Sequence, residues 1–296
     1  MHHLFCGLHV EPLTRAPFVS PTLGAQRFDS ADLAWPGPAE FLPCLGGFVG
    51  SDLLCGIVAT RLDEQIRPHA LFDIGTNGEL IVGSGQGIVC ASTAAGPAFE
   101  GGRIGAGMRA GTGAIDTVHV RNGALDCHVI GGGAARGICG SGLVDAAACG
   151  LELGQVGANG RVINAAKVLR LAGGIVLAQS DIRELQLAKG AMAAGMRMLV
   201  GAGVEKLYLA GAFGNYIRQS SARTIGLLPE DLLVEPVGNS SLRGARMLLL
   251  TPATRQTRLK KIAALSRHIE LAADPDFQYL YAEMMALAPY RLMTHA

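Results

Sequence analysis

The sequence predicts an α/β fold with a mixed sheet flanked by helices, and three observations support this class. Short apolar runs bounded by glycine turns are typical of strands, and they occur at residues 71–74, 79–82 and 87–91. Apolar residues recur at helical spacing over residues 181–199, which indicates a helix with one buried face. Strands and helices alternate after the first hairpins, which is the order found in α/β proteins.

Composition limits the classes of function. The chain has 296 residues, of which 49% are hydrophobic and 17% charged, so it can form one or two globular domains. The net charge is +1 and no basic stripe is present, which argues against a nucleic-acid partner. No apolar run reaches the ~18 residues of a membrane span, and the N-terminus does not resemble a signal peptide, so we expect no membrane association.

The seven cysteines are widely spaced and include no Cys-x-x-Cys pair. This pattern predicts reduced thiols and a cytoplasmic location. It also argues against an iron–sulfur cluster held within this chain, because such clusters need closely grouped thiolates.

The first sixty residues fall into two parts. Residues 11–43 contain six prolines, which predicts an extended, loop-like connection. Residues 44–62 carry apolar side chains at helical spacing, so a helix is expected there. Gly46, Gly50 and Gly56 make one side of this helix thin, so that another backbone could approach closely.

Local signals predict the remaining elements. Strands over residues 115–120 and 125–130 are joined by an Asn-Gly turn and form a hairpin. Capping signals and apolar periodicity predict four helices. These are 143–153 with Ser141 as N-cap, one that starts at Asp181 with Glu184 as its capping partner, 239–250 and 256–272.

Asp73 ends a buried strand, and the turn that follows contains Gly75, Thr76 and Asn77. Glycine lets turn amides approach a phosphate closely, so these three residues are candidates for phosphate binding. Asp73 is the candidate catalytic residue, because its carboxylate can hold Mg²⁺ through water or orient an attacking water. An ordinary hairpin with an acidic strand end fits this motif equally well.

Two further glycine-rich segments adjoin regular elements. Gly140 and Ser141 open a helix, where amides can bind an anion, although no Lys-Ser/Thr follows as in a Walker loop. Gly211, Phe213 and Gly214 follow a short buried strand, where small residues leave space for a flat ring or a ribose. A tight turn is the alternative at both places.

In their order and spacing, these three segments resemble the superfamily of acetate kinases, sugar kinases, heat-shock chaperones and actin. The resemblance implies an actin-like (ribonuclease H-like) ATPase lobe, plus an incomplete first lobe. The Asp73 turn would be its second phosphate loop, and the Gly211 segment its adenosine loop. The implied domains are 1–66, a remnant of the first lobe with a connecting helix; 67–237, the second lobe; and 238–296, helices that return to the first lobe.

A narrower resemblance rests on longer motifs, which are similar to the ATP-dependent reductive activators of corrinoid proteins. Members of this family return cobalt(II) corrinoids to cobalt(I). The resemblance therefore implies ATP and Mg²⁺ as cofactors, a corrinoid protein as partner, and electrons from an iron–sulfur domain. The matching motifs are Asp73–Glu79, Ala91–Gly101, Gly137–Asp145, Asp181–Lys189 and Leu209–Tyr216.

Ser92 lies in the second of these motifs and is the candidate contact to the corrinoid partner. A small hydroxyl among flexible residues can approach the edge of a cofactor closely. A solvated turn after a strand is the alternative interpretation.

The chain departs from the family pattern in three respects. The family's first phosphate loop, another strand with Asp-x-Gly-Thr-Thr, and its cysteine-rich segment normally precede the point that matches Met1. We therefore expect an N-terminally truncated chain, with the iron–sulfur cluster in the missing part, that does not transfer electrons alone. Whether such a chain acts as an enzyme stays open. Ala212 also stands where the family usually has glycine.

Two other functions fit the same residues. A small-molecule kinase of the same superfamily would transfer phosphate to an acetate-like or sugar-like acceptor. A non-catalytic module would dock on a corrinoid protein without using ATP. A homodimer is compatible with each of these functions.

Overall fold

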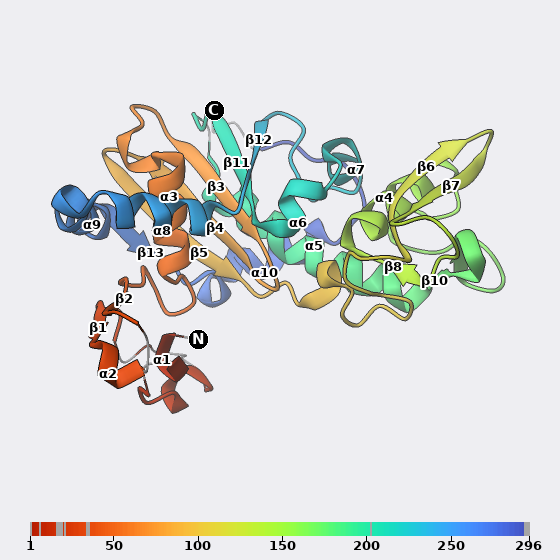
Figure 1. Cartoon of the computed structure of the whole chain (residues 1–296). Helices are drawn as coiled ribbons and strands as arrows, with labels where there is room; N and C mark the ends of the chain where they lie inside the picture. Colours follow the sequence, from red (N-terminus) through yellow and green to blue (C-terminus); the bar gives the residue numbers. More distant parts are fainter. Residues whose placement is uncertain are drawn as a thin grey trace.

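A six-stranded mixed sheet forms the centre of the molecule (Figure 1). The computed structural model describes residues 2–5, 7–15, 20, 22–33, 36–201 and 203–292. In spatial order the strands are β12 (Leu233–Gly238), β11 (Lys206–Ala210), β3 (His69–Ile74), β4 (Gly78–Ser84), β5 (Gly87–Thr93) and β13 (Ser266–His268). β3, β4 and β5 are antiparallel, whereas β11 pairs in parallel with β3 and β12, and β13 in parallel with β5. The predicted α/β class with a mixed sheet is thereby confirmed.

Different helices cover the two faces of this sheet. Leu71 and Ile81 pack with α3 (Ser51–Thr60) and α8 (Ser240–Leu250), whereas Phe72 and Leu80 pack with α5 (Gln179–Leu199). This alternation is expected, because successive side chains of a strand point to opposite faces. α9 (Pro252–Leu265) lies next to α8, and α10 (Pro275–Met284) packs on α5.

A second group of elements stands at the right of Figure 1. Its three-stranded sheet has the order β7 (Ala124–Val129), β6 (Ala114–Arg121), β8 (Gly137–Ile138), and α4 (Gly140–Glu152) packs on β6. The group also contains the hairpin of β9 (Val168–Arg170) and β10 (Val176–Ala178). The short helices α6 (Gly211–Tyr216) and α7 (Gln219–Thr224) follow β11. Phe72 and Ile115 belong to one apolar cluster, so a continuous core joins the two groups.

The N-terminal residues form short elements of their own: α1 (His2–Phe5), β1 (Gln26–Phe28), α2 (Ser30–Leu33) and β2 (Ala39–Phe41). β1 and β2 pair in antiparallel fashion, and the rings of Phe28 and Phe41 meet edge to face at 6.0 Å. The prediction of a loop-like connection over 11–43 is therefore wrong for these segments, because an aromatic pair stabilises a hairpin there. Pro17 and Pro21 lie outside the described residues.

Two predicted helices have different bounds. The helix expected over 44–62 begins only at Ser51, with Gly50 as its N-cap, since the glycines before it favour turns. The helix expected over 256–272 is α9 and ends at Leu265, because the next three residues join the sheet as β13.

Two predicted helix starts are also corrected. Cys139 is the N-cap of α4, so Ser141 is the second helical residue and not the cap. α5 begins at Gln179, two residues before the predicted start, and Asp181 caps it from within the first turn by accepting the Ala178 N–H at 2.8 Å. Asp181 thereby takes the role predicted for Glu184. Of the predicted apolar face of this helix, Leu185, Ala188, Met192 and Met196 are buried, whereas Leu199 at its end is partly buried.

Glycines allow close approach around α3. A Cβ on Gly56 would lie 2.7 Å from Leu71 Cδ2 and 3.3 Å from Ser240 Oγ, which confirms the thin side predicted at this residue. On the facing helix, a Cβ on Gly244 would overlap the backbone carbonyl of Cys55. The two helices therefore meet backbone to backbone.

Two polar side chains of α5 hold the C-terminal segment. Lys189 is only 1% exposed, and its ammonium donates to Ala286 O at 2.7 Å. Burial lowers the pKa of Lys189 to about 7. Gln186 Nε2 donates to Met285 O at 2.9 Å. These two side-chain donors thus hold the backbone that follows α10, together with a backbone hydrogen bond from Leu287 N–H to Ala158 O at 2.7 Å.

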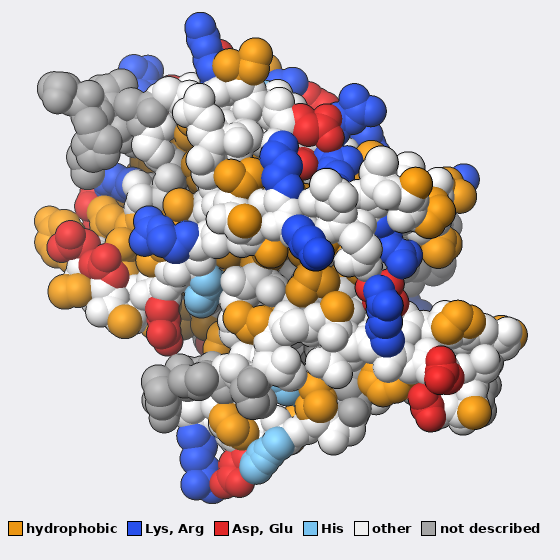
Figure 2. Space-filling model, turned by 90° about the vertical axis from the view of Figure 1, so that its left-hand side faces the viewer, with side chains coloured by type: hydrophobic (Ala, Val, Ile, Leu, Met, Phe, Trp, Pro, Cys, Tyr) orange, Lys and Arg blue, Asp and Glu red, His pale blue; other side chains and the backbone are white. Residues whose placement is uncertain are grey.

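The basic residues of α9 do not form one cationic patch. Figure 2 shows Lys and Arg side chains spread over the face that includes this helix. Arg258 pairs with Asp63 and Glu64 at 2.8 and 2.7 Å, and Arg255 pairs with Glu40 at 2.8 Å.

Two further features concern the predicted location. Cys55, Cys90, Cys127, Cys139 and Cys149 are free thiols, and Cys6 lies outside the described residues. Within the described parts of the chain, every helix is too short or too polar to span a bilayer.

The contact between α3 and α8 generates a prediction. Gly244→Ala should lower the free energy of unfolding by about 1 to 3 kcal/mol, because the new methyl group forces the two backbones apart. Denaturant titration monitored by circular dichroism checks this. Gly87→Ala is the matched control, since a Cβ there has open space around it. Equal midpoints for both variants would contradict the close approach.

Candidate functional site

Asp73 and Gly211 meet at the carboxyl ends of two parallel strands. β11 pairs with β3 so that Ala210 is opposite Asp73, and Gly211 follows with φ of +88°. A Cβ on Gly211 would lie 2.7 Å from Asp73 Oδ1 and 2.6 Å from Ile74 O. Only glycine fits this position, on both steric and backbone grounds. The structure thereby joins the first and third predicted segments.

The charge around Asp73 is uncompensated. Burial, and to a lesser degree the nearby Asp52 carboxylate, raise the pKa of Asp73 to about 6. Burial, together with the charges of Asp52 and Asp73, raises the pKa of Glu79 to about 8, although an Asn77 hydrogen bond acts in the opposite direction. Three carboxyl groups thus share one region without a pairing cation among the described residues. Such a region favours the approach of a cation.

The turn after β3 is closed on itself. The Gly75 N–H donates to Asn77 O at 2.9 Å, so this amide is already used within the turn. The exposed Thr76 donates its hydroxyl to Glu100 Oε1 at 2.7 Å, which ties the turn to the loop after β5. Binding of a phosphate by this turn would therefore compete with two internal hydrogen bonds.

The N-terminus of α4 lies against an aromatic pair. Phe99 and Phe213 stack with ring centroids 4.6 Å apart. A Cβ on Gly140 would overlap Phe99 O and lie 3.0 Å from Phe213 Cε2, so glycine is required there. Ser141 donates its hydroxyl to Asp116 O at 2.8 Å and thus fixes α4 to β6.

A cavity of about 380 Å³ opens beside this stack. It is lined by residues from three segments that are distant in sequence, among them Phe99, Gly140, Ser141 and Phe213. An apolar, partly aromatic wall next to helix-start amides suits a flat base joined to polar groups. Gly214 does not line the cavity; it is buried in α6, where a Cβ would lie 3.0 Å from Leu209 Cγ.

Ser92 and Asn77 line a second cavity, of about 510 Å³. This cavity lies between the end of β5, the residues after β13 and the loop before α3, and its walls include Phe48 and His268. Burial lowers the pKa of His268. The candidate partner contact is therefore separate from the Phe213 cavity, and Asn77 is the turn residue that reaches it.

The predicted residues therefore form three neighbouring clusters. The sequence interpretation assigned no role to Met108, Arg109 or Tyr216, which also line the Phe213 cavity. The loop that carries Met108 and Arg109 gave no recognisable signal, because its glycines are typical of any turn. Tyr216 is the last residue of the motif Leu209–Tyr216, and this position is the one sequence feature that could have indicated a role in the cavity.

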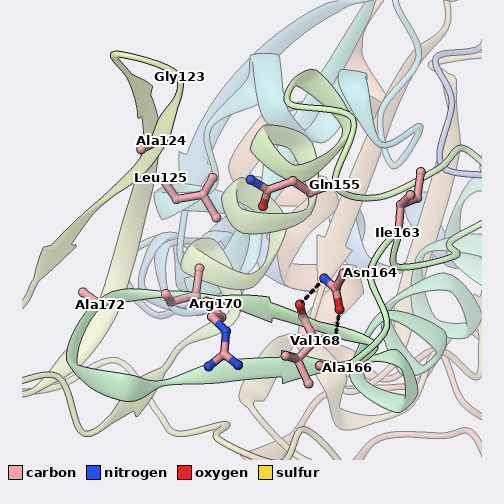
Figure 3. A pocket seen from close by; sticks show the side chains of 11 residues that line it. Gly123, Ala124, Leu125, Gln155, Ile163, Asn164, Ala166, Val168, Arg170 and Ala172 are labelled. Atoms are coloured by element: carbon pink, nitrogen blue, oxygen red, sulfur yellow. Dashed lines mark hydrogen bonds between the residues drawn. The ribbon is translucent and has the colours of Figure 1, made fainter.

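A larger hollow, of about 670 Å³, lies away from all of these residues (Figure 3). It is bounded by the start of β7, the loop around Ile163 and β9, and Asn164 is hydrogen-bonded to the backbone of Val168. None of the predicted site residues lines it. Size therefore does not identify the functional site here.

The residues near Asp73 fit a hydrated metal ion better than a tightly held one. Within the described residues, no group of three His, Cys, Asp or Glu side chains is arranged to hold a metal ion directly. Mg²⁺ commonly keeps several waters and is held by one or two carboxylates plus phosphate oxygens. Asp73, with its unpaired carboxylate at a glycine-lined strand end, fits that mode of binding.

Comparison with known proteins gives consistent results. The family profile described as the C-terminal domain of RACo, the ASKHA domain, matches residues 68–295, and the RACo middle region matches residues 1–65. A solved structure, the reductive activator for corrinoid,iron-sulfur protein, superposes with a TM-score of 0.85 at 30% identity. That superposition covers 98% of this chain and 51% of the other. The predicted actin-like fold is confirmed.

Two curated relatives point the same way. The chain is 35% identical to the corrinoid activation enzyme RamQ of Eubacterium limosum, over 95% of this chain and 53% of that protein. It is 30% identical to the [Co(II) methylated amine-specific corrinoid protein] reductase of Methanosarcina barkeri, over 81% of this chain and 49% of that protein. The chain thus spans about half the length of these relatives. It belongs to the RACo family of corrinoid reductive activators, with the ASKHA domain over residues 68–295.

Proposed function

We propose that this chain is the ATP-binding part of a reductive activator that returns a cobalt(II) corrinoid protein to cobalt(I). The step adds one electron to cobalt, and an iron–sulfur domain that is not part of this chain would supply it. ATP hydrolysis would drive this unfavourable transfer. The reduced thiols of the chain suit work in the cytoplasm.

One observation carries the nucleotide part of this proposal. The close contact of Gly211 with Asp73 sets the acidic strand end beside α6, whose Phe213 lines the aromatic cavity. A nucleotide with its base in that cavity would direct its phosphates toward the strand ends. In this arrangement Asp73 would hold hydrated Mg²⁺ or orient water, and the turn amides and the α4 N-terminus would meet phosphate oxygens.

The corrinoid part of the proposal rests on the relatives. The names of the two curated relatives describe proteins that activate or reduce corrinoid proteins, and each is at least 30% identical to this chain over the aligned residues. Ser92 would contact the corrinoid partner from the second cavity. A corrinoid ring is broad and largely apolar, and the exposed Phe48 beside Ser92 would suit such a surface.

Calorimetric titration with magnesium-ATP tests the nucleotide site. The wild-type chain should bind in the micromolar range, about −8 kcal/mol. Asp73→Asn should weaken binding about tenfold, because the isosteric amide keeps the shape but cannot hold the cation. Glu152→Gln, at the end of α4, serves as a control for a general loss of charge. A folded chain that binds no nucleotide would favour the docking module over the ATPase.

The raised pKa of Asp73 predicts a pH dependence. Protons compete with a cation for this carboxylate, so affinity for magnesium-ATP should fall as pH is lowered from 7 through about 6 to 5. Glu79, with a pKa raised to about 8, is already mostly protonated over this range and adds little.

The same shift has a consequence for stability. The folded-state pKa of Asp73 exceeds its usual value of 3.8, so its stabilising contribution is present below that value and is lost as pH rises through about 6. Asp73→Asn should therefore remove the pH dependence of both binding and stability in this range. Calorimetry and denaturant midpoints at pH 5, 6 and 7 measure binding and stability. If both depended on pH in Asp73→Asn as they do in the wild-type chain, Asp73 would not be the group that titrates.

A further inference from the structure

A row of three polar side chains crosses the central sheet. Asp73 on β3 is paired with Glu79 on β4, and Glu79 is paired with Ser92 on β5. Directly paired residues project from the same face of a sheet. Neighbouring strands are about 4.8 Å apart, so Glu79 lies midway between two residues whose backbones are about 10 Å apart.

This row marks the end of apolar packing on that face. Two residues away on each strand, Leu71, Ile81 and Cys90 form the adjacent row on the same face, and all three are buried under α3 and α8. The polar row therefore begins where the helices stop covering the sheet. Asp52, in the first turn of α3, is the charged group near the polar row on the helix-covered side of the sheet.

Stability does not account for Glu79 at this position. The side chain is half-buried between the carboxyl groups of Asp52 and Asp73, and within the described residues it makes no ion pair. A partly buried acid beside two others destabilises a fold unless something else binds there. An apolar residue would extend the row of Ile81 without this penalty.

Glu79 touches both functional regions. Its carboxyl interacts with the side chain of Asn77, which belongs to the nucleotide-binding turn. Asn77 and Ser92 line the same 510 Å³ cavity. Glu79 thus interacts with the turn through Asn77, and Ser92 is its neighbour on the next strand.

We propose that Glu79 is a positioning residue that couples the nucleotide-binding turn to the surface around Ser92. The inference rests on the proposed function, because it assumes that nucleotide binds at the Asp73 turn. Glu79 would touch neither nucleotide nor partner; it would act through the side chain of Asn77 on one side and through its cross-strand neighbour Ser92 on the other. Nucleotide binding at the turn would thereby change the shape of the surface around Ser92.

Hydrogen exchange measured by mass spectrometry tests this coupling without a partner protein. Magnesium-bound, non-hydrolysable ATP analogue at saturation should change amide exchange in residues 91–95 of the wild-type chain about threefold or more. Glu79→Ala should bind the analogue, confirmed by calorimetry, yet lose this response. Glu79→Gln should retain it, because the amide preserves the shape of the side chain and its interaction with Asn77.

Two outcomes separate this inference from the proposed function. No analogue binding by the wild type would overturn both. Binding with no response at 91–95 in the wild type, or an undiminished response in Glu79→Ala, would overturn the coupling alone. Glu235→Ala, a carboxylate on the same face of β12, is the matched control and should respond as the wild type does. Loss of the response in this control as well would show a general effect on the sheet, and the role of Glu79 would be refuted.

Discussion

The parallel pairing of β11 with β3 is the constraint on which the candidate site depends. It brings Ala210 opposite Asp73, although more than a hundred residues separate them along the chain. The parts of the site are then attached to one end of these strands: the turn after β3, the α6 residues after β11 and, through α5 and the helical turn Pro97–Glu100, the start of α4. If this pairing slipped by one residue, Gly211 would no longer face Asp73, and a side chain would occupy the space between the strand ends.

Glycine serves this site by allowing contact between backbones. At Gly211 and Gly140 the nearest neighbour of a hypothetical Cβ is a backbone oxygen, which cannot rotate away as a flexible side chain can. Close packing at these glycines thus fixes the two segments relative to Asp73 and to the Phe99–Phe213 stack, and the hydrogen bond from the Ser141 hydroxyl to Asp116 O adds to it. The backbone of the site is thereby held in one arrangement before a ligand binds, which is a form of preorganisation.

Much of the fold followed from the sequence, because local periodicity and burial agree in its central elements. The strands of the Asp73 hairpin and the stripe of α5 were predicted closely, since both have continuous apolar patterns. The bounds of α3 and the hairpin of β1 and β2 were not. Apolar spacing before Ser51 predicted a helix where the glycines instead favour turns, and the prolines near Phe41 predicted a loop where tertiary contacts form a strand pair. The grouping of Asp73 with Gly211 was recognisable as a motif, whereas the contribution of Arg109 to the Phe213 cavity depends on a loop path that no local pattern encodes.

The anchoring of the C-terminal segment by Lys189 bears on synthesis of the protein. α5 is complete once residue 199 has been made, but the acceptor for its buried ammonium, Ala286 O, lies 97 residues after Lys189 in the chain. Domains generally begin to fold from the N-terminal side during translation. A nascent chain that still lacks the segment around Ala286 leaves the ammonium of Lys189 without this acceptor. The final docking of α5 therefore waits for the synthesis of that segment, and truncation before residue 286 should destabilise α5 although the helix itself is left intact.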